Sequence, residues 1–248
     1  MPKQFYSFFV ALLCAFTAKA EVTYHFDEQS QVLRVSGEGA ADDGGYRSYV
    51  RSVILEEGIT SVKNGGFNAA YNLQNISFPS TLQSIGNLAF NCADLRGSVT
   101  VPSSVQSIGD SAFRDNHNLQ EVIISDGVKS IGAKVFYATY NLTSISIPDS
   151  LETIHESSFI SVAPQKIQIS SSMIEKFLNA MGSLQNVTDF KCTDSIAKCK
   201  KVLRQLGYEN LIEYVSFGGV RVKKRFYTIQ EAEALSKKSG NKFKLRYK

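Results

Sequence analysis

The sequence has no tryptophan, only three histidines and only four cysteines among its 248 residues. Histidine is the usual base that activates a serine or cysteine nucleophile, histidine and cysteine are common transition-metal ligands, and no spacing here matches either kind of site. No glycine-rich loop of the phosphate-binding type precedes an expected helix. The sequence therefore predicts a protein that is not an enzyme, with no catalytic residue, no metal and no cofactor.

Long apolar runs are also missing. Beyond the N-terminus no run reaches 18 residues, so no transmembrane segment is expected in the mature chain. At the N-terminus, Lys3 precedes an apolar stretch from Phe5 to Phe16, and Ala18 and Ala20 are small where a signal peptidase cleaves. This pattern predicts a signal peptide over residues 1–20, cleaved near Ala20, and a mature protein that is secreted or held at the cell surface, in the periplasm or outside the cell.

The net charge of +4 is too small to indicate nucleic-acid binding, and no nucleic-acid partner is expected. The distribution of charge is more informative than its sum. Residues 21–190 hold 10 basic and 18 acidic side chains, whereas residues 191–248 hold 15 basic and 5 acidic ones. The chain is therefore polarised, with an acidic body and a basic C-terminal end.

Phenylalanine recurs every 23 residues through the middle of the chain. Aliphatic columns keep the same interval, as do short alternations such as Ile145-Ser146-Ile147, which are typical of strands with one buried face. Proline follows three of these strands, and glycine follows the next apolar residue where the backbone needs a positive φ or a close approach. The phenylalanine column consists of Phe67, Phe90, Phe113, Phe136 and Phe159, the proline column of Pro79, Pro102 and Pro148, and the glycine column of Gly86, Gly109 and Gly132.

A single 23-residue unit cannot fold alone. Its five or so large apolar side chains contribute about 8–15 kcal/mol on burial, while ordering the unit costs about 1–2 kcal/mol per residue in backbone entropy. The units must therefore stack, which predicts an α/β solenoid whose strands form a parallel sheet on one face. Two irregularities stand out: Leu95 comes one residue early relative to its column, and Lys63 and His155 replace glycine in the first and last units.

Segments such as the one from Val105 to Phe113 and the one from Leu142 to Ile154 resemble the BspA-like leucine-rich repeats, written L-x-x-I-x-I-P-x-x-V-x-x-I-G-x-x-A-F. The resemblance extends from about Tyr49 to Phe159. It implies a leucine-rich repeat solenoid, and it implies secreted or surface proteins that bind matrix proteins or other cells. The alternating residues Val22 to Phe26 and Val32 to Val35 resemble the N-terminal cap of that family, a β-hairpin that covers the first coil.

Five segments follow from these patterns: a signal peptide (1–20), an N-terminal β-hairpin cap (21–48), the leucine-rich repeat solenoid (49–170), C-terminal α/β repeats or a mixed α/β cap (171–217), and a basic C-terminal tail module (218–248). In the fourth segment a strand is expected over 166–169 and another over 187–191. Helices are expected from a serine cap at Ser172 to Met181 and from an Asp194 cap to Leu206, and a strand over 211–217. Continued coils are the preferred interpretation of this segment, and a separate small α/β unit is the alternative.

Cys192 and Cys199 fall on the second of these strands and on the helix that follows it. In an exported protein they are expected to form a disulfide, with two free thiols as the alternative.

The surface of the sheet is the expected binding site. Its outward positions form one column of mostly small side chains, Ile54, Ser77, Thr100, Ile123 and Ser146. We expect this column to bind a protein or glycan ligand on another cell or on the matrix. A second hypothesis places an anionic cell-envelope surface against the basic tail at Lys223, Lys224 and Arg225; the alternative is a solvated basic cap.

The predicted function is therefore protein–protein interaction or adhesion, directed to molecules on host or neighbouring cells. The alternative is a secreted enzyme or inhibitor whose activity lies in residues 171–248, with the repeats as a targeting module. No histidine follows His155, which argues against Ser-His or Cys-His chemistry in that segment.

Overall fold

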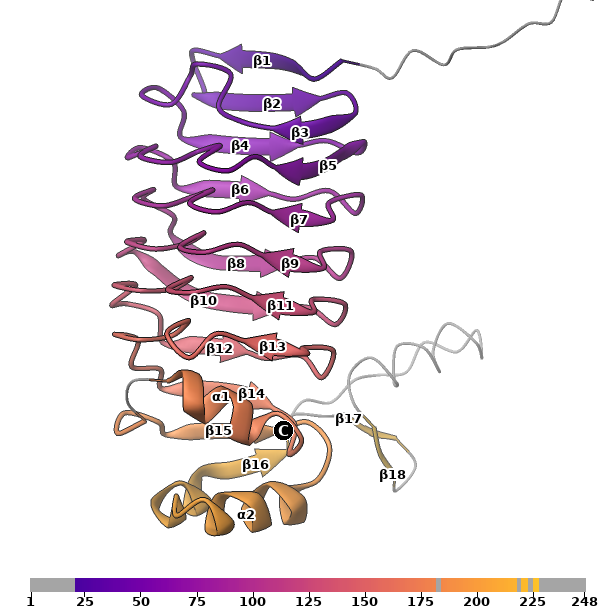
Figure 1. Cartoon of the computed structure of the whole chain (residues 1–248), viewed down its shortest axis with the longest axis vertical. Coiled ribbons are helices and arrows are strands. Elements are labelled where there is room, and N and C mark those ends of the chain that lie inside the picture. Colours follow the sequence, from indigo (N-terminus) through magenta and orange to yellow (C-terminus); the bar gives the residue numbers. More distant parts are fainter. Residues whose placement is uncertain (1–20, 182–183, 218–219, 223–224, 228–248) are drawn as a thin grey trace, which may run out of the picture.

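The computed structural model describes residues 21–181, 184–217, 220–222 and 225–227. The expected signal peptide, the tail beyond residue 227, Lys223 and Lys224 lie outside this range. Arg225 lies on a described strand, of which only the backbone is described. The described residues up to 217 form one elongated stack of coils, with the N-terminal hairpin at one end and two helices at the other (Figure 1).

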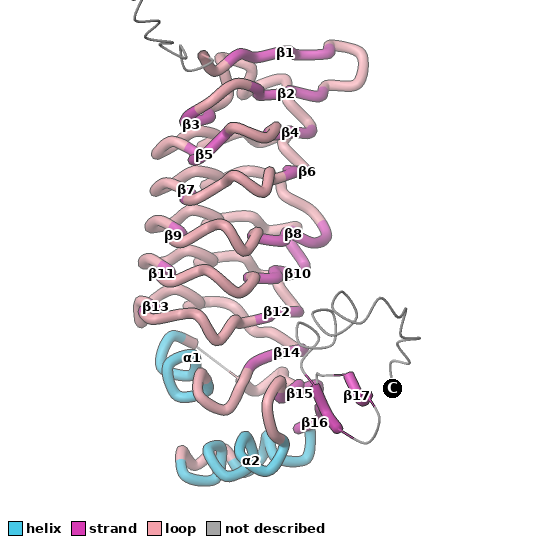
Figure 2. Tube along the Cα trace, turned by 90° about the vertical axis from the view of Figure 1, so that its right-hand side faces the viewer, coloured by secondary structure: helices cyan, strands magenta, loops and turns pink. Residues whose placement is uncertain are grey.

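Most strands belong to one of two parallel stacks that run along the coils (Figures 1 and 2). We call the first the main sheet; it comprises β2 (Val32–Ser36), β4 (Ser52–Leu55), β6 (Asn75–Ser77), β8 (Gly97–Val101), β10 (Leu119–Ile124), β12 (Ser144–Ser146), β14 (Lys166–Ile169), β15 (Asp189–Cys192) and β16 (Val215–Phe217). The second sheet comprises β3 (Gly39–Ala41), β5 (Ile59–Val62), β7 (Ser84–Ile85), β9 (Ser107–Ile108), β11 (Ser130–Ile131) and β13 (Thr153–Ile154).

The predicted solenoid is confirmed, but its sheet is not confined to one face. Strands such as β7 and β9 are two residues long, too short to show an alternating pattern in the sequence. They form a ladder because the 23-residue step brings Ser84 opposite Ser107 and Ile85 opposite Ile108.

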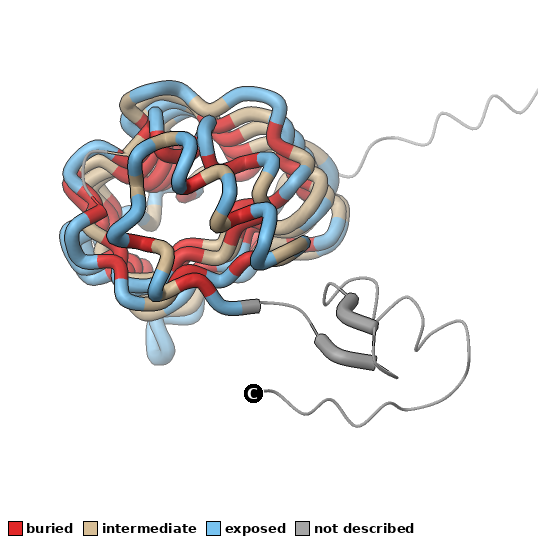
Figure 3. The backbone as a smooth tube through the Cα atoms, turned by 90° about the horizontal axis from the view of Figure 1, so that it is seen from below, coloured by how far each residue is buried: buried red, intermediate tan, exposed pale blue. Residues whose placement is uncertain are grey.

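The phenylalanine column forms the centre of the core. All five rings are fully buried, and neighbouring rings stack with centroids 5.2–5.7 Å apart. Phe177 of helix α1 (Ile174–Ala180) packs edge-on against Phe159 at the end of the row, with ring centroids 5.2 Å apart. Viewed along the stack, buried residues line the inside of each coil and exposed residues the outside (Figure 3). The repeat therefore determines the core directly, because each coil places one phenylalanine at the same position in its interior.

The glycine column allows the backbones of adjacent coils to approach closely. Of the two reasons expected for glycine, a positive φ or a close approach, the second is the one observed. None of its members has a positive φ. A Cβ atom at Gly109 would lie 2.6 Å from the backbone nitrogen of Asn87 in the preceding coil, and one at Gly132 would lie 2.8 Å from that of Asp110. A side chain at these positions would therefore push adjacent coils apart.

The coil that contains Leu95 is irregular, and the main-sheet ladder is interrupted there between β6 and β8. Asn116, which is fully buried, compensates for this irregularity. Its Oδ1 accepts a hydrogen bond from the Leu95 N–H at 3.2 Å, and its Nδ2 donates to the carbonyls of Phe90 (2.8 Å) and Phe113 (2.9 Å). A polar side chain thus occupies a column that holds alanine in the two preceding coils, Ala70 and Ala93.

The N-terminal hairpin is confirmed. Strand β1 (Thr23–Asp27) pairs antiparallel with β2, and the Asp27 carboxylate accepts hydrogen bonds from the N–H groups of Gln29 and Ser30 in the turn. Tyr24 donates a hydrogen bond to Asp42 at 2.6 Å. Burial, together with that hydrogen bond, raises the pKa of Tyr24 to about 12. The hairpin covers the first parallel edge strand of the main sheet.

At the C-terminal end the coils continue through residues 171–217, which is the preferred interpretation of the sequence. Helices replace the strands of the second sheet there. Strands β14, β15 and β16 extend the main sheet in parallel, and α1 (Ile174–Ala180) and α2 (Ile196–Gln205) connect them (Figure 2). The expected strand over 211–217 is wrong over most of its length: η1, a 3₁₀ helix, occupies Glu209–Tyr214. Beyond β16, β17 (Val220–Val222) pairs antiparallel with β18 (Arg225–Tyr227).

Both expected helix caps are wrong. Helix α1 has no side-chain cap, because the Ser172 hydroxyl bonds to Ser170 instead. The N-cap of α2 is Ser195, whose hydroxyl accepts from the Lys198 N–H at 3.4 Å. The Asp194 carboxylate instead accepts from the N–H and hydroxyl of Ser171 in the preceding coil.

Candidate functional site

The predicted binding column lies on the outward side of the main sheet. The ladder pairs Ile54 with Ser77 on one side of the interruption, and Thr100 with Ile123 and Ile123 with Ser146 on the other. Ser77 and Thr100 are exposed, whereas both isoleucines and Ser146 are half-buried. The isoleucines are separated by two hydroxyl-bearing residues, so they form two isolated apolar points and not a continuous strip.

The column continues beyond the residues predicted for it. Ser146 pairs with Gln168 of β14, Gln168 with Lys191 of β15, and Lys191 with Ser216 of β16. These residues were missed because the phenylalanine repeat ends at Phe159 and the step from Ser146 to Gln168 is 22 residues instead of 23. The alternating segments Lys166–Ile169 and Asp189–Cys192 were the available signal.

The outer face is hollowed over β10, β12, β14 and β15. This depression, which we call the sheet hollow, has a volume of about 500 Å³. Only Ile123 and Ser146 of the predicted column line it. The rest of its lining consists of two isoleucines, Ile145 and Ile167, and of the polar residues Gln120, Glu121, Thr143, Ser144, Lys166, Gln168 and Lys191.

The charged groups of the sheet hollow differ in how they are held. Glu121 accepts a hydrogen bond from the Ser144 hydroxyl at 3.1 Å, and Lys191 lies 3.8 Å from Asp189. Within the described chain, the Lys166 ammonium has no ion-pair or hydrogen-bond partner. The hollow therefore presents a free cation, an anchored carboxylate and a small apolar patch at Ile123, which suits a polar ligand with an acidic group.

The histidines make local contacts. His25 lies on β1 opposite Arg34. The His117 ring stacks on Tyr140, and its Nδ1 lies 2.8 Å from the carbonyl oxygen of Ala138. The Nδ1 atom of His155 lies 2.9 Å from the hydroxyl oxygen of Ser157 and accepts a hydrogen bond from the Ser157 N–H at 3.1 Å. These contacts join two residues of the same turn.

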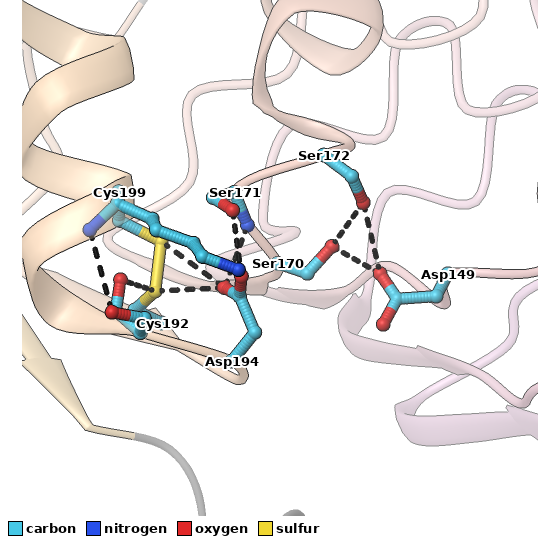
Figure 4. The surroundings of a disulfide bond; sticks show 9 residues. Asp149, Ser170, Ser171, Ser172, Cys192, Asp194 and Cys199 are labelled. Atoms are coloured by element: carbon cyan, nitrogen blue, oxygen red, sulfur yellow. Dashed lines mark hydrogen bonds between the residues drawn. A yellow bond between two sulfur atoms is a disulfide. The ribbon is translucent and has the colours of Figure 1, made fainter.

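Cys192 of β15 and Cys199 of α2 are joined by a disulfide, with sulfur atoms 1.97 Å apart (Figure 4). Asp194 Oδ1 lies 3.3 Å from the sulfur of Cys192. Burial alone would raise the pKa of Asp194, but the hydrogen bonds from Ser171, together with those from the backbone at Ser195 and Asp194, outweigh it and the pKa is lowered. The two sulfurs and the carboxylate lie within 4.8 Å of one another. Because a disulfide sulfur is not a thiolate, the bonded pair does not provide a metal site.

Coils of 23 residues with parallel ladders on two faces and a stacked phenylalanine core define a leucine-rich repeat solenoid. The family model described as "BspA type Leucine rich repeat region" matches six copies over residues 46–163 and 91–203. The chain therefore belongs to the BspA-type leucine-rich repeat family. This membership implies a role in protein interaction.

Several solved bacterial structures are similar. A leucine-rich repeat protein from Eubacterium ventriosum is 19% identical, with 71% of this chain and 60% of that chain covered and a TM-score of 0.43. One from Bacteroides ovatus is 21% identical, covering 68% and 54%, with a TM-score of 0.44. A leucine rich cell surface protein from Faecalibacterium prausnitzii is 20% identical, covering 72% and 50%, with a TM-score of 0.44. This chain thus spans 50–60% of the lengths of these three proteins.

No curated protein sequence matches this chain significantly. Among the residues that the structure describes, no helix has the length and apolar character needed to cross a membrane.

Proposed function

We propose that this protein is exported and that it mediates adhesion by binding a protein or glycan on host or neighbouring cells with the sheet hollow. The observation that carries the proposal is the depression on the outer face of the main sheet, which is lined by polar side chains from four successive strands and by Ile123 of the predicted column. A solenoid binds ligands on the extended surface that its repeats build, and the parallel ladder holds this surface rigid.

The small side chains around the hollow support the same proposal. Thr143, Ser144 and Ser146 leave the main-sheet backbone open to a ligand, while Lys166, Gln168 and Lys191 border it with longer polar groups. A shallow site lined by polar side chains and by three isoleucines, Ile123, Ile145 and Ile167, fits a peptide or saccharide better than it fits a lipid chain.

Changing Ile123 and Ser146 together to glutamate is expected to weaken ligand binding about tenfold or more, because two long side chains would fill the hollow and their negative charge would repel an acidic ligand. The matched control changes Ile54 and Ser77 to glutamate, the same residue pair in coils outside the hollow. Binding of the mature protein to a panel of extracellular-matrix proteins and to a glycan array measures the effect, with thermal unfolding as the check on folding. Equal losses in both variants, or no loss in the hollow variant, would place the site elsewhere.

Export is tested separately. The positive, apolar and small-residue pattern of residues 1–20 is expected to direct cleavage after Ala20, so the exported protein should begin at Glu21. N-terminal sequencing of protein recovered from the medium and the cell envelope measures this. Recovery of only the full-length chain from the cytosol would contradict it.

A further inference from the structure

Helix α2 lies at the C-terminal end of the coil stack (Figure 1) and is rich in positive charge. Its ten residues include Lys198, Lys200, Lys201 and Arg204 and no aspartate or glutamate. Lys198, Lys201 and Arg204 are exposed. Because residues three apart lie on the same side of a helix, these three form one row, which we call the α2 stripe.

The α2 stripe is not neutralised by its surroundings. Across the described ranges of the chain, no carboxylate forms an ion pair with its three cations. The nearest acidic residue in sequence, Asp194, is engaged by Ser171, and the N-cap of α2 is the uncharged Ser195.

This arrangement is unfavourable for the helix itself. Like charges three residues apart repel each other, and Lys198 lies in the first turn, where the helix dipole disfavours a cation. Carboxylates at some of these positions would stabilise α2. An anion supplied from outside would relieve the same repulsion.

The opposite side of α2 is already committed to the core. Cys199 and Leu203 are fully buried, and Val202 and Leu206 pack against the hydrophobic core. The disulfide from Cys199 to Cys192 ties the helix to β15. The α2 stripe is therefore presented on a fixed support, with little apolar surface beside it except Ile196, which is 37% exposed.

The buried apolar face of α2 distinguishes between two kinds of anionic partner, a membrane surface and a soluble polymer. An amphipathic helix that lies on a membrane inserts its apolar face into the lipid, and the apolar face of α2 is not available for this. A polymer with regularly placed anionic groups needs only the row of cations.

We propose that the α2 stripe is a binding site for a polyanionic glycan that carries sulfate or carboxylate groups. The site lies on a different part of the molecule from the sheet hollow, so it does not depend on the function proposed above. It also differs from the predicted contact at Lys223, Lys224 and Arg225.

The experiment measures elution of the full mature chain from immobilised heparin, used as a sulfated-glycan probe, in a salt gradient. Changing Lys198, Lys201 and Arg204 to glutamine keeps helix propensity and removes only charge. The variant is expected to elute at lower salt and to bind heparin about tenfold more weakly than the unaltered protein. A matched control changes Arg51, Lys129 and Lys134, three exposed cations elsewhere on the solenoid, to glutamine and is expected to elute close to the unaltered protein.

Two further arms separate the alternatives. A variant with Lys223, Lys224 and Arg225 changed to glutamine tests the tail, and vesicles of phosphatidylcholine with phosphatidylglycerol test a membrane surface. The proposal is overturned if the control weakens heparin binding as much as the α2 variant, if only the tail variant weakens it, or if the α2 variant changes vesicle binding but not heparin binding. Unchanged circular dichroism of the α2 variant, together with the loss of heparin binding, supports it.

Discussion

Replacing Phe113 with alanine is expected to lower the free energy of unfolding by about 3–5 kcal/mol. The ring is fully buried in the middle of the phenylalanine column, with centroids 5.3 Å from Phe90 and 5.7 Å from Phe136. Its removal leaves a cavity between two coils and breaks the row of stacked rings at its centre. Urea unfolding followed by far-ultraviolet circular dichroism measures the loss.

The control for this variant is Tyr140→Ala, which removes an aromatic ring that is 64% exposed and stacks on His117. Because little buried surface is lost, its effect is expected to stay below about 1 kcal/mol. Similar losses in the two variants would mean that the phenylalanine column does not carry the core.

Changing Asn116 to leucine is expected to cost about 1–3 kcal/mol. Leucine keeps the size of the side chain but leaves the Leu95 N–H without a partner, and a buried group left unpaired costs about 1–3 kcal/mol. The carbonyls of Phe90 and Phe113 lose the hydrogen bonds from Asn116 but still accept from the Ala93 N–H and the Thr139 hydroxyl. Because leucine is apolar and similar in size to asparagine, burying it instead costs little stability by itself, so the measured loss reports the missing hydrogen bonds. Thermal and urea unfolding both report the change.

Asn118→Leu is the matched control, two residues away. That side chain is exposed and donates one hydrogen bond, to Asp94 at 2.6 Å. Its replacement is expected to change stability by less than about 1 kcal/mol. If Asn116→Leu proved as mild as this control, the irregular coil would not depend on the buried amide.

The core and the repeating coils could be predicted from the sequence because both follow from local periodicity. Phe67, Phe90 and Phe113 keep the 23-residue step, and alternation such as that of Ile145 and Ile147 marks a strand with one buried face. Stacking is required because one coil cannot offset its own loss of entropy. The hairpin at the N-terminus and the continuation of the coils through α1 and α2 followed from the same kind of pattern.

The site was only partly predictable. Ile123 and Ser146 were identified from the repeat, but Lys166, Gln168 and Lys191 join them through a register that departs from the 23-residue step. A shift of one residue moves a side chain to the other face of a strand, so the membership of the sheet hollow depends on pairing that the repeat no longer specifies.

By itself, the sequence determined the repeat, the buried column and the solenoid class, because these depend on which residues recur at one spacing. Only the tertiary structure decided the second sheet, the capping of α2 by Ser195 instead of Asp194, the role of Asn116 and the shape of the sheet hollow. Each of these depends on which backbone and side-chain groups of neighbouring coils come within hydrogen-bonding or contact distance. The contacts that decide them include pairs 20 or more positions apart in the chain, such as Asn116 with Leu95 and Asp194 with Ser171, and the spacing of apolar residues does not record such pairs.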